Sequence, residues 1–264
     1  MATQHSGWRR ASGASAIVLA VLSAACSPLV PLAPRAPSAV APSVPAAAPA
    51  PVTPSQPEAA AAPETPPARI GGRLADFGRE RVSSDARTIA NWVADSGDNH
   101  ALPFIIVDKV RARVLVFDPE ARLLGASPAL LGLAKGDDSV PGIGERPMAE
   151  IRPEERTTPA GRFAAEMGRN ASGEDILWVD YDSAVSMHRV RATNPAERRL
   201  QRLASRTPRD NRISYGCINL PESFYDRIVK PAFEPHDGIV YVLPETRPAA
   251  KVFGAYEVTP LARR

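Results

Sequence analysis

Phe104-Ile105-Ile106-Val107, followed after a turn at Asp108-Lys109 by Val114-Leu115-Val116-Phe117, is the stretch that decides the fold class of this chain. Both runs are short and rich in β-branched and aromatic residues, so with the turn between them they predict an opening strand pair. Runs of the same kind recur at residues 163–167, 176–180 and 239–243. Turn signals separate them, including Thr158-Pro159-Ala160-Gly161 and Asp237-Gly238. No series of alternating strands and helices is visible, so we predict a mainly β domain.

A few helices are predicted around these strands. Apolar residues recur at helical spacing over residues 79–94, which predicts an amphipathic helix that ends at Asp95-Ser96-Gly97 and packs against the β domain. Two shorter helices are expected from Pro195 to Ser205, with Asn194 as the N-cap, and from Pro221 to about Val229.

The amino-terminal part of the chain has a different composition. Residues 1–26 have the order of a secretory signal, with Arg9-Arg10, an apolar run and small residues before Cys26. The run is about nine residues, whereas a membrane-spanning helix needs about twenty, so we expect a cleaved leader rather than a permanent anchor. The protein is therefore predicted to be exported, to the periplasm or cell envelope. Ser-Ala-Ala-Cys resembles a bacterial lipobox, which would make Cys26 a lipidated first residue; ordinary cleavage near Ala25 is the alternative.

The following region, residues 27–69, is predicted to be a disordered linker. Thirteen of the 28 prolines lie between Pro28 and Pro67, and the region has no aromatic residue and little charge. Such a segment cannot bury enough apolar area to offset its ordering entropy. It can act as a tether that reaches about 100 Å, or as a spacer of unselected length. A helical segment at 70–100, a β domain at 101–246 and a tail at 247–264 follow.

Charge and cysteine content exclude several classes of protein. The net charge is +3, and most of it lies in the leader and linker, so the folded part lacks the positive excess of a nucleic-acid-binding protein. Two cysteines exclude a disulfide scaffold and a cysteine-rich metal site. No His-x-x-Glu pair is present, which argues against a zinc peptidase. We expect no metal and no organic cofactor.

Cys217 is the candidate nucleophile. If Cys26 is lipidated or removed, Cys217 is the only thiol left in the mature chain, within Ser214-Tyr215-Gly216-Cys217-Ile218-Asn219. A glycine before the thiol lets backbone N–H groups approach an oxyanion, and a helix starting near Pro221 would favour the thiolate. A buried apolar cysteine and a bridge to Cys26 are the alternatives. Of the four histidines, His188 follows a strand-like stretch and is the candidate base.

This combination resembles the L,D-transpeptidase catalytic domain family. That family pairs a histidine at a strand end with a downstream Ser/Thr-His-Gly-Cys-hydrophobic-Asn/Arg segment, which His188 and residues 214–219 match at every position but Tyr215. The opening strand pair, Thr158-Pro159-Ala160-Gly161-Arg162-Phe163 and the closing residues 237–242 are also similar to its motifs, so the resemblance runs from about Leu102 to Pro244. It implies a mixed β-sandwich or barrel and makes 101–246 an L,D-transpeptidase-like catalytic domain.

Two features depart from the family pattern. Tyr215 stands where the family has a histidine or basic residue, and a tyrosine donates one hydrogen bond but carries no positive charge. The 25 residues between His188 and Ser214 are also more than usual, and we interpret the Arg-rich helix at 195–205 as a lid or rim.

The resemblance implies acyl transfer on peptidoglycan peptide stems. Cys217, deprotonated by His188, would attack a tetrapeptide stem, and backbone N–H groups near Gly216 would hold the oxyanion. An amine acceptor would give a 3-3 crosslink or attach a protein to the wall, and water would make the enzyme an L,D-carboxypeptidase. The residues assigned to supporting the turn are Ser214, Tyr215 and Asn219, and those assigned to the stem carboxylates are Arg189, Arg191 and Arg212. A catalytically impaired wall-binding lipoprotein and a cysteine hydrolase of another amide are the rival hypotheses.

Overall fold

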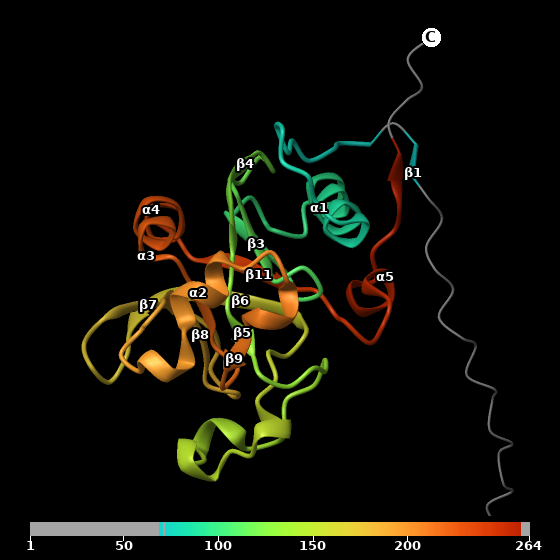
Figure 1. The fold of residues 1–264 in the computed structure, drawn as a ribbon. Coiled ribbons are helices and arrows are strands. Elements are labelled where there is room, and N and C mark those ends of the chain that lie inside the picture. The colour runs from blue at the N-terminus through green and yellow to red at the C-terminus, as the bar shows by residue number, and fades with distance from the viewer. Residues whose placement is uncertain (1–68, 71, 260–264) are drawn as a thin grey trace, which may run out of the picture. The chain divides into compact units, whose positions relative to one another are not determined.

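The computed structural model describes residues 69–70 and 72–259 (Figure 1). The predicted leader with Cys26, nearly all of the linker and the last five residues of the predicted tail lie outside the described residues. Within the described ranges, no helix is both long and apolar enough to cross a membrane.

Strands dominate the described part of the chain. In chain order they are β1 (Arg69–Ile70), β2 (Phe104–Asp108), β3 (Arg113–Phe117), β4 (Leu123–Pro128), β5 (Leu131–Gly132), β6 (Gly161–Arg169), β7 (Asp175–Asp180), β8 (Val185–Arg189), β9 (Arg212–Ser214), β10 (Ile218–Leu220), β11 (Gly238–Val242) and β12 (Val258–Thr259). The α-helices are α1 (Ser84–Ser96), α2 (Arg199–Ala204), α3 (Glu222–Phe224), α4 (Lys230–Phe233) and α5 (Ala249–Phe253). Short 3₁₀ turns lie at Ile143–Glu145, Met148–Glu150, Pro153–Glu155, Pro195–Glu197 and Pro208–Asn211, and a π-helical turn at Tyr225–Val229. The predicted mainly β class with few short helices is confirmed.

Eight of these strands form one mixed sheet that nearly closes on itself. Their order is β10-β8-β7-β6-β11-β2-β3-β4, with β11 parallel to β2 and antiparallel to β6. Beyond β4, Leu130 exchanges two backbone hydrogen bonds with Asn219 of β10, at 2.8 and 2.9 Å. This pair of bonds joins the two ends of the sheet.

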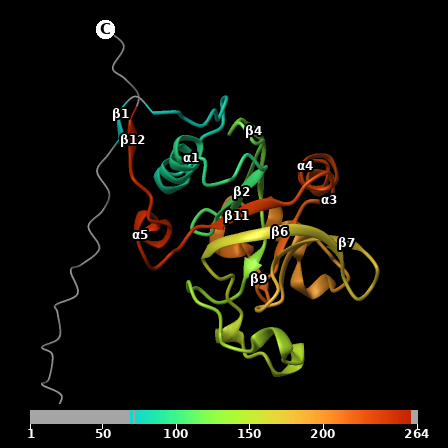
Figure 2. The same ribbon diagram turned by 180° about the vertical axis from the view of Figure 1, so that it is seen from behind.

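The central strands are buried on both faces. Along β2, Ile105 and Val107 pack into one apolar core, and Phe104 and Ile106 into another, as alternation across a strand requires. The first core lies within the curved sheet, against the turn at Tyr225–Val229; the second lies under α1 and α5, which cover the other face (Figures 1 and 2). Because both faces of β2 are buried, every position of the strand favours an apolar side chain, and the sequence is a continuous apolar run. Burial of each large apolar side chain stabilises the fold by about 1.5–3 kcal/mol.

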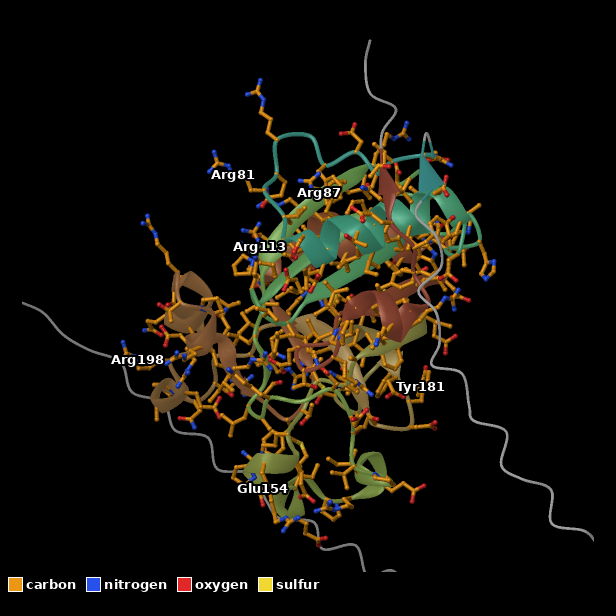
Figure 3. The ribbon with its side chains drawn as sticks, turned by 90° about the vertical axis from the view of Figure 1, so that its right-hand side faces the viewer. Arg81, Arg87, Arg113, Glu154, Tyr181 and Arg198 are labelled. Atoms are coloured by element: carbon orange, nitrogen blue, oxygen red, sulfur yellow. The ribbon has the colours of Figure 1, made fainter. Side chains whose placement is uncertain are left out.

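The helices differ from the sequence prediction at their ends. α1 begins at Ser84 rather than Arg79, because the Ser83 hydroxyl accepts the Ala86 N–H at 3.1 Å as an N-cap. Gly97, in the left-handed region, ends it as predicted. Arg81, which precedes this helix, and Arg87, which lies on it, are both exposed (Figure 3).

The two shorter predicted helices are each interrupted. Asn194 does cap the first, accepting the Ala196 N–H at 3.1 Å, but a positive φ of 52° at Arg198 separates the 3₁₀ turn from α2. The second continues beyond Val229 to Phe233 through a π-helical turn. Pro231 lies just after that turn and has no N–H to donate to the carbonyl four residues earlier, which accounts for the widened helix.

A fully buried lysine directly after β2 joins its own turn to two other loops. The Lys109 ammonium donates to the Gly136 carbonyl at 2.5 Å, the Asp137 carboxylate at 3.0 Å and the Thr158 carbonyl at 2.9 Å. Burial lowers the pKa of Lys109, and the hydrogen bond to Asp137 opposes this. Burial alone would raise the pKa of Asp137, yet bonds from Thr246, the Glu245 backbone and Lys109 hold it well below its ordinary range. Each buried charge therefore depends on the other.

We predict that Lys109→Met destabilises the domain by roughly 3–5 kcal/mol, because it removes the buried cation of Asp137 and leaves that carboxylate only the half-exposed Arg247, 3.5 Å away. Urea unfolding followed by circular dichroism measures this. Lys135→Met is the matched control, since Lys135 is exposed on a neighbouring loop and its loss should change stability by less than about 0.5 kcal/mol. Equal stability of the two variants would contradict the prediction.

The depressed pKa of Asp137 also predicts acid sensitivity. A carboxyl whose folded-state pKa is lowered contributes full stability above its unfolded value of about 3.9, and that stability is lost as the pH falls through the folded value. The free energy of unfolding should thus fall steadily below about pH 4. Asp137→Asn should be less stable at pH 7 and show a shallower decline on acidification; an unchanged slope would exclude Asp137 as a contributor.

Candidate active site

Two adjacent parallel strands bring the predicted catalytic residues together. β8 and β10 pair so that Asn219 lies opposite His188 and Ile218 opposite Met187. Cys217 directly precedes β10, which places its thiol beside Ser186 of β8, with 3.7 Å between Sγ and the serine Oγ. The thiol also lies 3.7 Å from the Ala184 carbonyl. Residues far apart in the chain thus share one strand end.

The surroundings of Cys217 favour its thiolate. Burial raises the pKa of the thiol, but interactions with His188 and hydrogen bonds from the Ser186 backbone and hydroxyl outweigh burial and bring the pKa below its ordinary value. These groups belong to β8. Helix α3 begins at Glu222, as the prediction of a helix from near Pro221 requires, but it lies beyond β10, and the interactions that lower the pKa come from β8. The thiolate is therefore stabilised by the neighbouring strand.

His188 is held at both ring nitrogens. Nδ1 lies 2.7 Å from the Arg189 carbonyl oxygen, which can only accept, so Nδ1 carries the hydrogen. Nε2 lies 3.2 Å from the amide nitrogen of Asn219, and in the neutral ring it is then the acceptor. A ring in this state can receive a proton at Nε2. Asn219, assigned from the sequence to supporting the turn, contacts the base directly.

The turn before the thiol is closed by side chains. Ser214 Oγ donates to the Cys217 carbonyl at 2.6 Å and accepts the Gly216 N–H at 3.2 Å. Gly216 has φ 138°, and a Cβ there would lie 2.9 Å from the Thr157 carbonyl oxygen, so only glycine fits. Because the Gly216 N–H is bonded to Ser214, its predicted role in the oxyanion site would require that bond to open. That role stays a prediction.

Thr158 links this turn to the buried lysine. Its hydroxyl donates to the Gly216 carbonyl at 2.7 Å and accepts the Gly132 N–H at 2.9 Å, while its carbonyl accepts from Lys109. The side chain is completely buried. The Thr-Pro motif found in the sequence is therefore a support for the nucleophile turn.

Tyr215 is accompanied by a cation that the sequence did not reveal. The Arg156 guanidinium carbon lies 3.9 Å from the centre of the Tyr215 ring, a cation–π contact. Its Nε and Nη2 also donate to the Ile151 carbonyl, at 3.2 and 3.0 Å. Positive charge is thus present beside the position where the family carries a basic residue. No local pattern marks Arg156, because the contact is made between distant loops.

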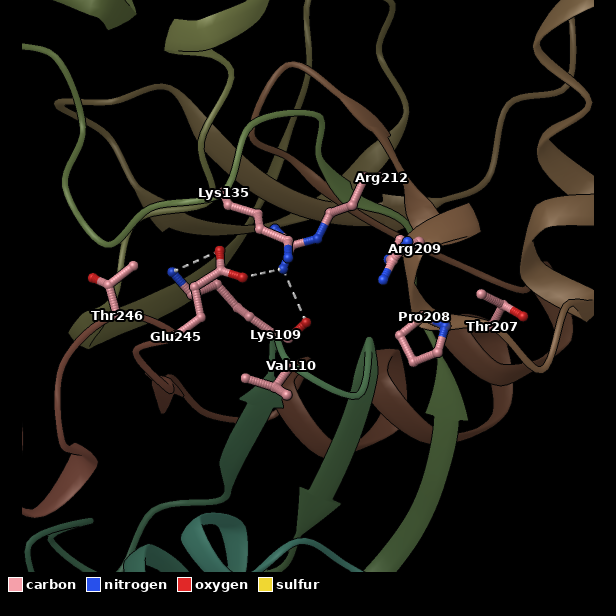
Figure 4. Close-up of a pocket in the computed structure, with 9 residues that line it drawn as sticks. All are labelled: Lys109, Val110, Lys135, Thr207, Pro208, Arg209, Arg212, Glu245 and Thr246. Carbon is pink, nitrogen blue, oxygen red and sulfur yellow. Dashed lines mark hydrogen bonds and ion pairs between the residues drawn. The ribbon is translucent and has the colours of Figure 1, made fainter.

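Of the three arginines assigned to substrate, only Arg191 lines the thiol pocket, and it is ion-paired with Glu174. Arg189 pairs with Asp175 at 3.1 Å and with Asp226. Arg212 belongs to a different pocket of about 660 Å³, where it pairs with Glu245 at 2.7 Å (Figure 4). The structure does not bring Arg189 and Arg212 to the thiol.

The thiol opens into a pocket of about 310 Å³. Residues of the nucleophile segment, of β8, of the segment between β8 and β9 and of the 3₁₀ turn at Met148–Glu150 line it: Met148, His188, Arg191, Thr193, Asn194, Glu197, Arg199, Ser214, Tyr215, Cys217 and Asn219. Larger pockets lie elsewhere in the described part of the chain, but none of those found includes Cys217 or His188. Among the described residues, no group of three His, Cys, Asp or Glu side chains is placed to hold a metal ion.

No family model matches the chain, and no curated protein matches it. Among solved structures, the chain is similar to the L,D-transpeptidase LdtMt1 in complex with imipenem, with 16% identity and a TM-score of 0.30 over 53% of this chain and 58% of that one. It is also similar to the catalytic domain of the E. faecium L,D-transpeptidase, solved by NMR, with 16% identity and a TM-score of 0.26 over 53% of this chain and 95% of that one. The match spans less than two thirds of the length of LdtMt1.

We predict that Cys217 reacts with iodoacetamide at a pH below the range of a free thiol. The alkylation rate of a Cys26→Ser chain should rise with a midpoint below about pH 8.5, because the pKa of Cys217 is lowered. His188→Ala should move the midpoint upward, since the interaction with His188 lowers that pKa. Cys217→Ala is the control and should give no adduct. A midpoint at or above about 8.5 would contradict the prediction.

Proposed function

We propose that this protein is a peptidoglycan L,D-transpeptidase that transfers a peptide stem through a thioester on Cys217. The observation that carries the proposal is a thiol of lowered pKa beside a histidine whose Nε2 is an acceptor, on paired strands, within the Ser-x-Gly-Cys-x-Asn segment that resembles the family motif. A nucleophile, its base and a group that orients the base are the components of covalent acyl transfer.

The first half-reaction uses these residues in sequence. His188 Nε2 accepts the thiol proton, and Sγ attacks the carbonyl of the third residue of a tetrapeptide stem. The tetrahedral intermediate collapses to a thioester when the bond to the terminal D-Ala nitrogen breaks, and His188 returns the proton to that amine. Because the Gly216 N–H is bonded to Ser214, we assign the oxyanion to the Cys217 N–H.

The second half-reaction resolves the thioester. The amine of another stem attacks the thioester carbonyl, His188 takes its proton, and the thiolate leaves, which produces a 3-3 crosslink. Water in place of the amine would release a tripeptide stem that ends in a free carboxyl group and regenerate the thiol, the reaction of an L,D-carboxypeptidase. Arg191 lies at the rim of the thiol pocket, and we assign it to binding a stem carboxylate. To do so, it would exchange its ion pair with Glu174 for one with the substrate.

Export and tethering complete the proposal. A signal peptide over residues 1–26 would bring the domain to the periplasm or cell envelope, where peptidoglycan lies, and lipidation of Cys26 would add a membrane anchor. The Pro/Ala-rich linker at 27–69 would then allow the site to reach the wall. Wall remodelling by a tethered transpeptidase is the resulting biological role.

Acylation by a carbapenem tests the chemistry. The purified protein should gain the mass of one carbapenem, and Cys217→Ala should gain none. His188→Ala should acylate about 10²–10⁴-fold more slowly, since general base catalysis is lost. A Cys217 that is alkylated by iodoacetamide but forms no adduct with carbapenem or stem would contradict the proposal and favour another amide substrate.

Disaccharide-tetrapeptide substrate then separates the two outcomes. Mass spectrometry of the products should detect 3-3 linked dimers as well as released D-Ala. Tripeptide stems without dimers would identify a carboxypeptidase, and binding of intact peptidoglycan with no released D-Ala would identify a wall-binding protein.

A further inference from the structure

Arg199, in the segment inserted between β8 and β9, contacts the catalytic strands from outside the sequence motif. It is the first residue of α2 and is largely buried, with its side chain 15% exposed. Its Nη1 donates to the Asn219 Oδ1 at 2.6 Å, and its Nε is bonded to the Glu197 carboxylate. Both acceptor groups line the thiol pocket. The rim segment predicted from the sequence therefore extends into the site.

The contact with Arg199 determines which way the Asn219 amide points. A guanidinium has only donors, so it is the oxygen of Asn219 that must face Arg199. The amide nitrogen must then face His188 Nε2, from which it lies 3.2 Å. Since this nitrogen has only hydrogens to offer, Nε2 must present its lone pair. Arg199 at Oδ1, helped by the Cys217 carbonyl 3.4 Å from the amide nitrogen, thus sets the hydrogen-bond direction from Arg199 to the imidazole.

We propose that Arg199 is a positioning residue that directs the Asn219 amide N–H at His188 Nε2, so that this nitrogen is less readily protonated than it would be without Arg199. The inference rests on the proposed thiol–histidine chemistry. When Nε2 takes the thiol proton, its new N–H faces an NH₂ group and, beyond it, a guanidinium, so the proton is held weakly and returns readily to the leaving amine. Without Arg199 the amide can rotate, Oδ1 can accept the Nε2–H, and the imidazolium is stabilised.

Other charges near His188 do not supply the same effect. Arg189 offers the ring its carbonyl, and its guanidinium pairs with Asp175 of β7 and Asp226 of the π-helical turn. The Glu197 carboxylate is bonded to Arg199 itself. The titratable and charged side chains that share the pocket with the ring are Arg191, Glu197, Arg199, Tyr215 and Cys217. Of these, only Arg199 has a side chain that bonds to Asn219; Cys217 contacts Asn219 through its backbone carbonyl, 3.4 Å from the amide nitrogen.

The protonation of His188 measured by ¹⁵N NMR tests the inference. We would titrate the full-length chain in the Cys217→Ala background, so that thiol ionisation does not couple to the ring. Arg199→Met should move protonation of Nε2 upward by about one pH unit, a tenfold gain in proton affinity. Asn219→Asp should move it at least as far, because a carboxylate accepts the Nε2–H directly.

Two further variants separate positioning from a general structural effect. Arg199→Lys should keep the wild-type titration, because an ammonium also offers only donors to Asn219. Arg198→Asn is the matched charge control: it removes the adjacent cation, which lies outside the thiol pocket, and asparagine tolerates its left-handed backbone. It should also titrate like the parent chain.

The inference is overturned if Arg199→Met titrates like the parent, or if Arg198→Asn shifts the ring as far as Arg199→Met does. Its failure is distinguishable from failure of the proposed function. If Arg199 does not act through Asn219 on His188, carbapenem acylation still depends on Cys217 and His188. If His188→Ala leaves the acylation rate unchanged, the proposed function is wrong even where the NMR shift is observed.

Discussion

The buried ion pair between Lys109 and Asp137 is the interaction on which the rest of the site depends. The Lys109 ammonium is removed from water and bonded to three groups on two loops, Gly136 and Asp137 on one and Thr158 on the other. The Thr158 hydroxyl in turn holds the Gly216 carbonyl of the nucleophile turn. A buried charge that lacks any of its hydrogen-bond partners is strongly destabilising. The loops are therefore held in the arrangement in which the Lys109 ammonium and the Asp137 carboxylate are both fully hydrogen-bonded. Packing of the sheet alone would not impose this precision on a turn.

The second requirement is the parallel pairing of β8 with β10, which sets the thiol, the imidazole and the amide of Asn219 at one strand end. Strands give these groups fixed positions, and the inserted segment adds the Arg199 contact without altering the strand register. The domain can therefore vary the rim of the site while its reacting groups stay in place. The contact between Arg156 and Tyr215 is a second case in which a loop adds to the site without moving the strands, since Arg156 supplies a positive charge that the motif lacks.

Local composition predicted the strands whose side chains are β-branched and buried on both faces, such as β2, β3 and β11. It did not predict β4, whose sequence Leu-Leu-Gly-Ala-Ser-Pro contains no β-branched residue. Gly125 in β4 lies against the side chains of Phe224 and Ile228, so a small residue is needed there, and pairing with β3 makes it a strand. For the site, the motif identified Cys217, His188 and Asn219 as residues, but not the contact between the last two.

By itself, the sequence determined the β class, the candidate nucleophile and the glycine before it, because strand propensity and a close-packed turn are properties of neighbouring residues. Only the tertiary structure decided that Arg189 and Arg212 form ion pairs away from the thiol, that Asn219 bonds to the imidazole, and that Arg156 and Arg199 reach the site. A charged or amide side chain takes its role from whichever partner lies within about 3 Å, and that partner is set by strand register and loop packing across long stretches of chain.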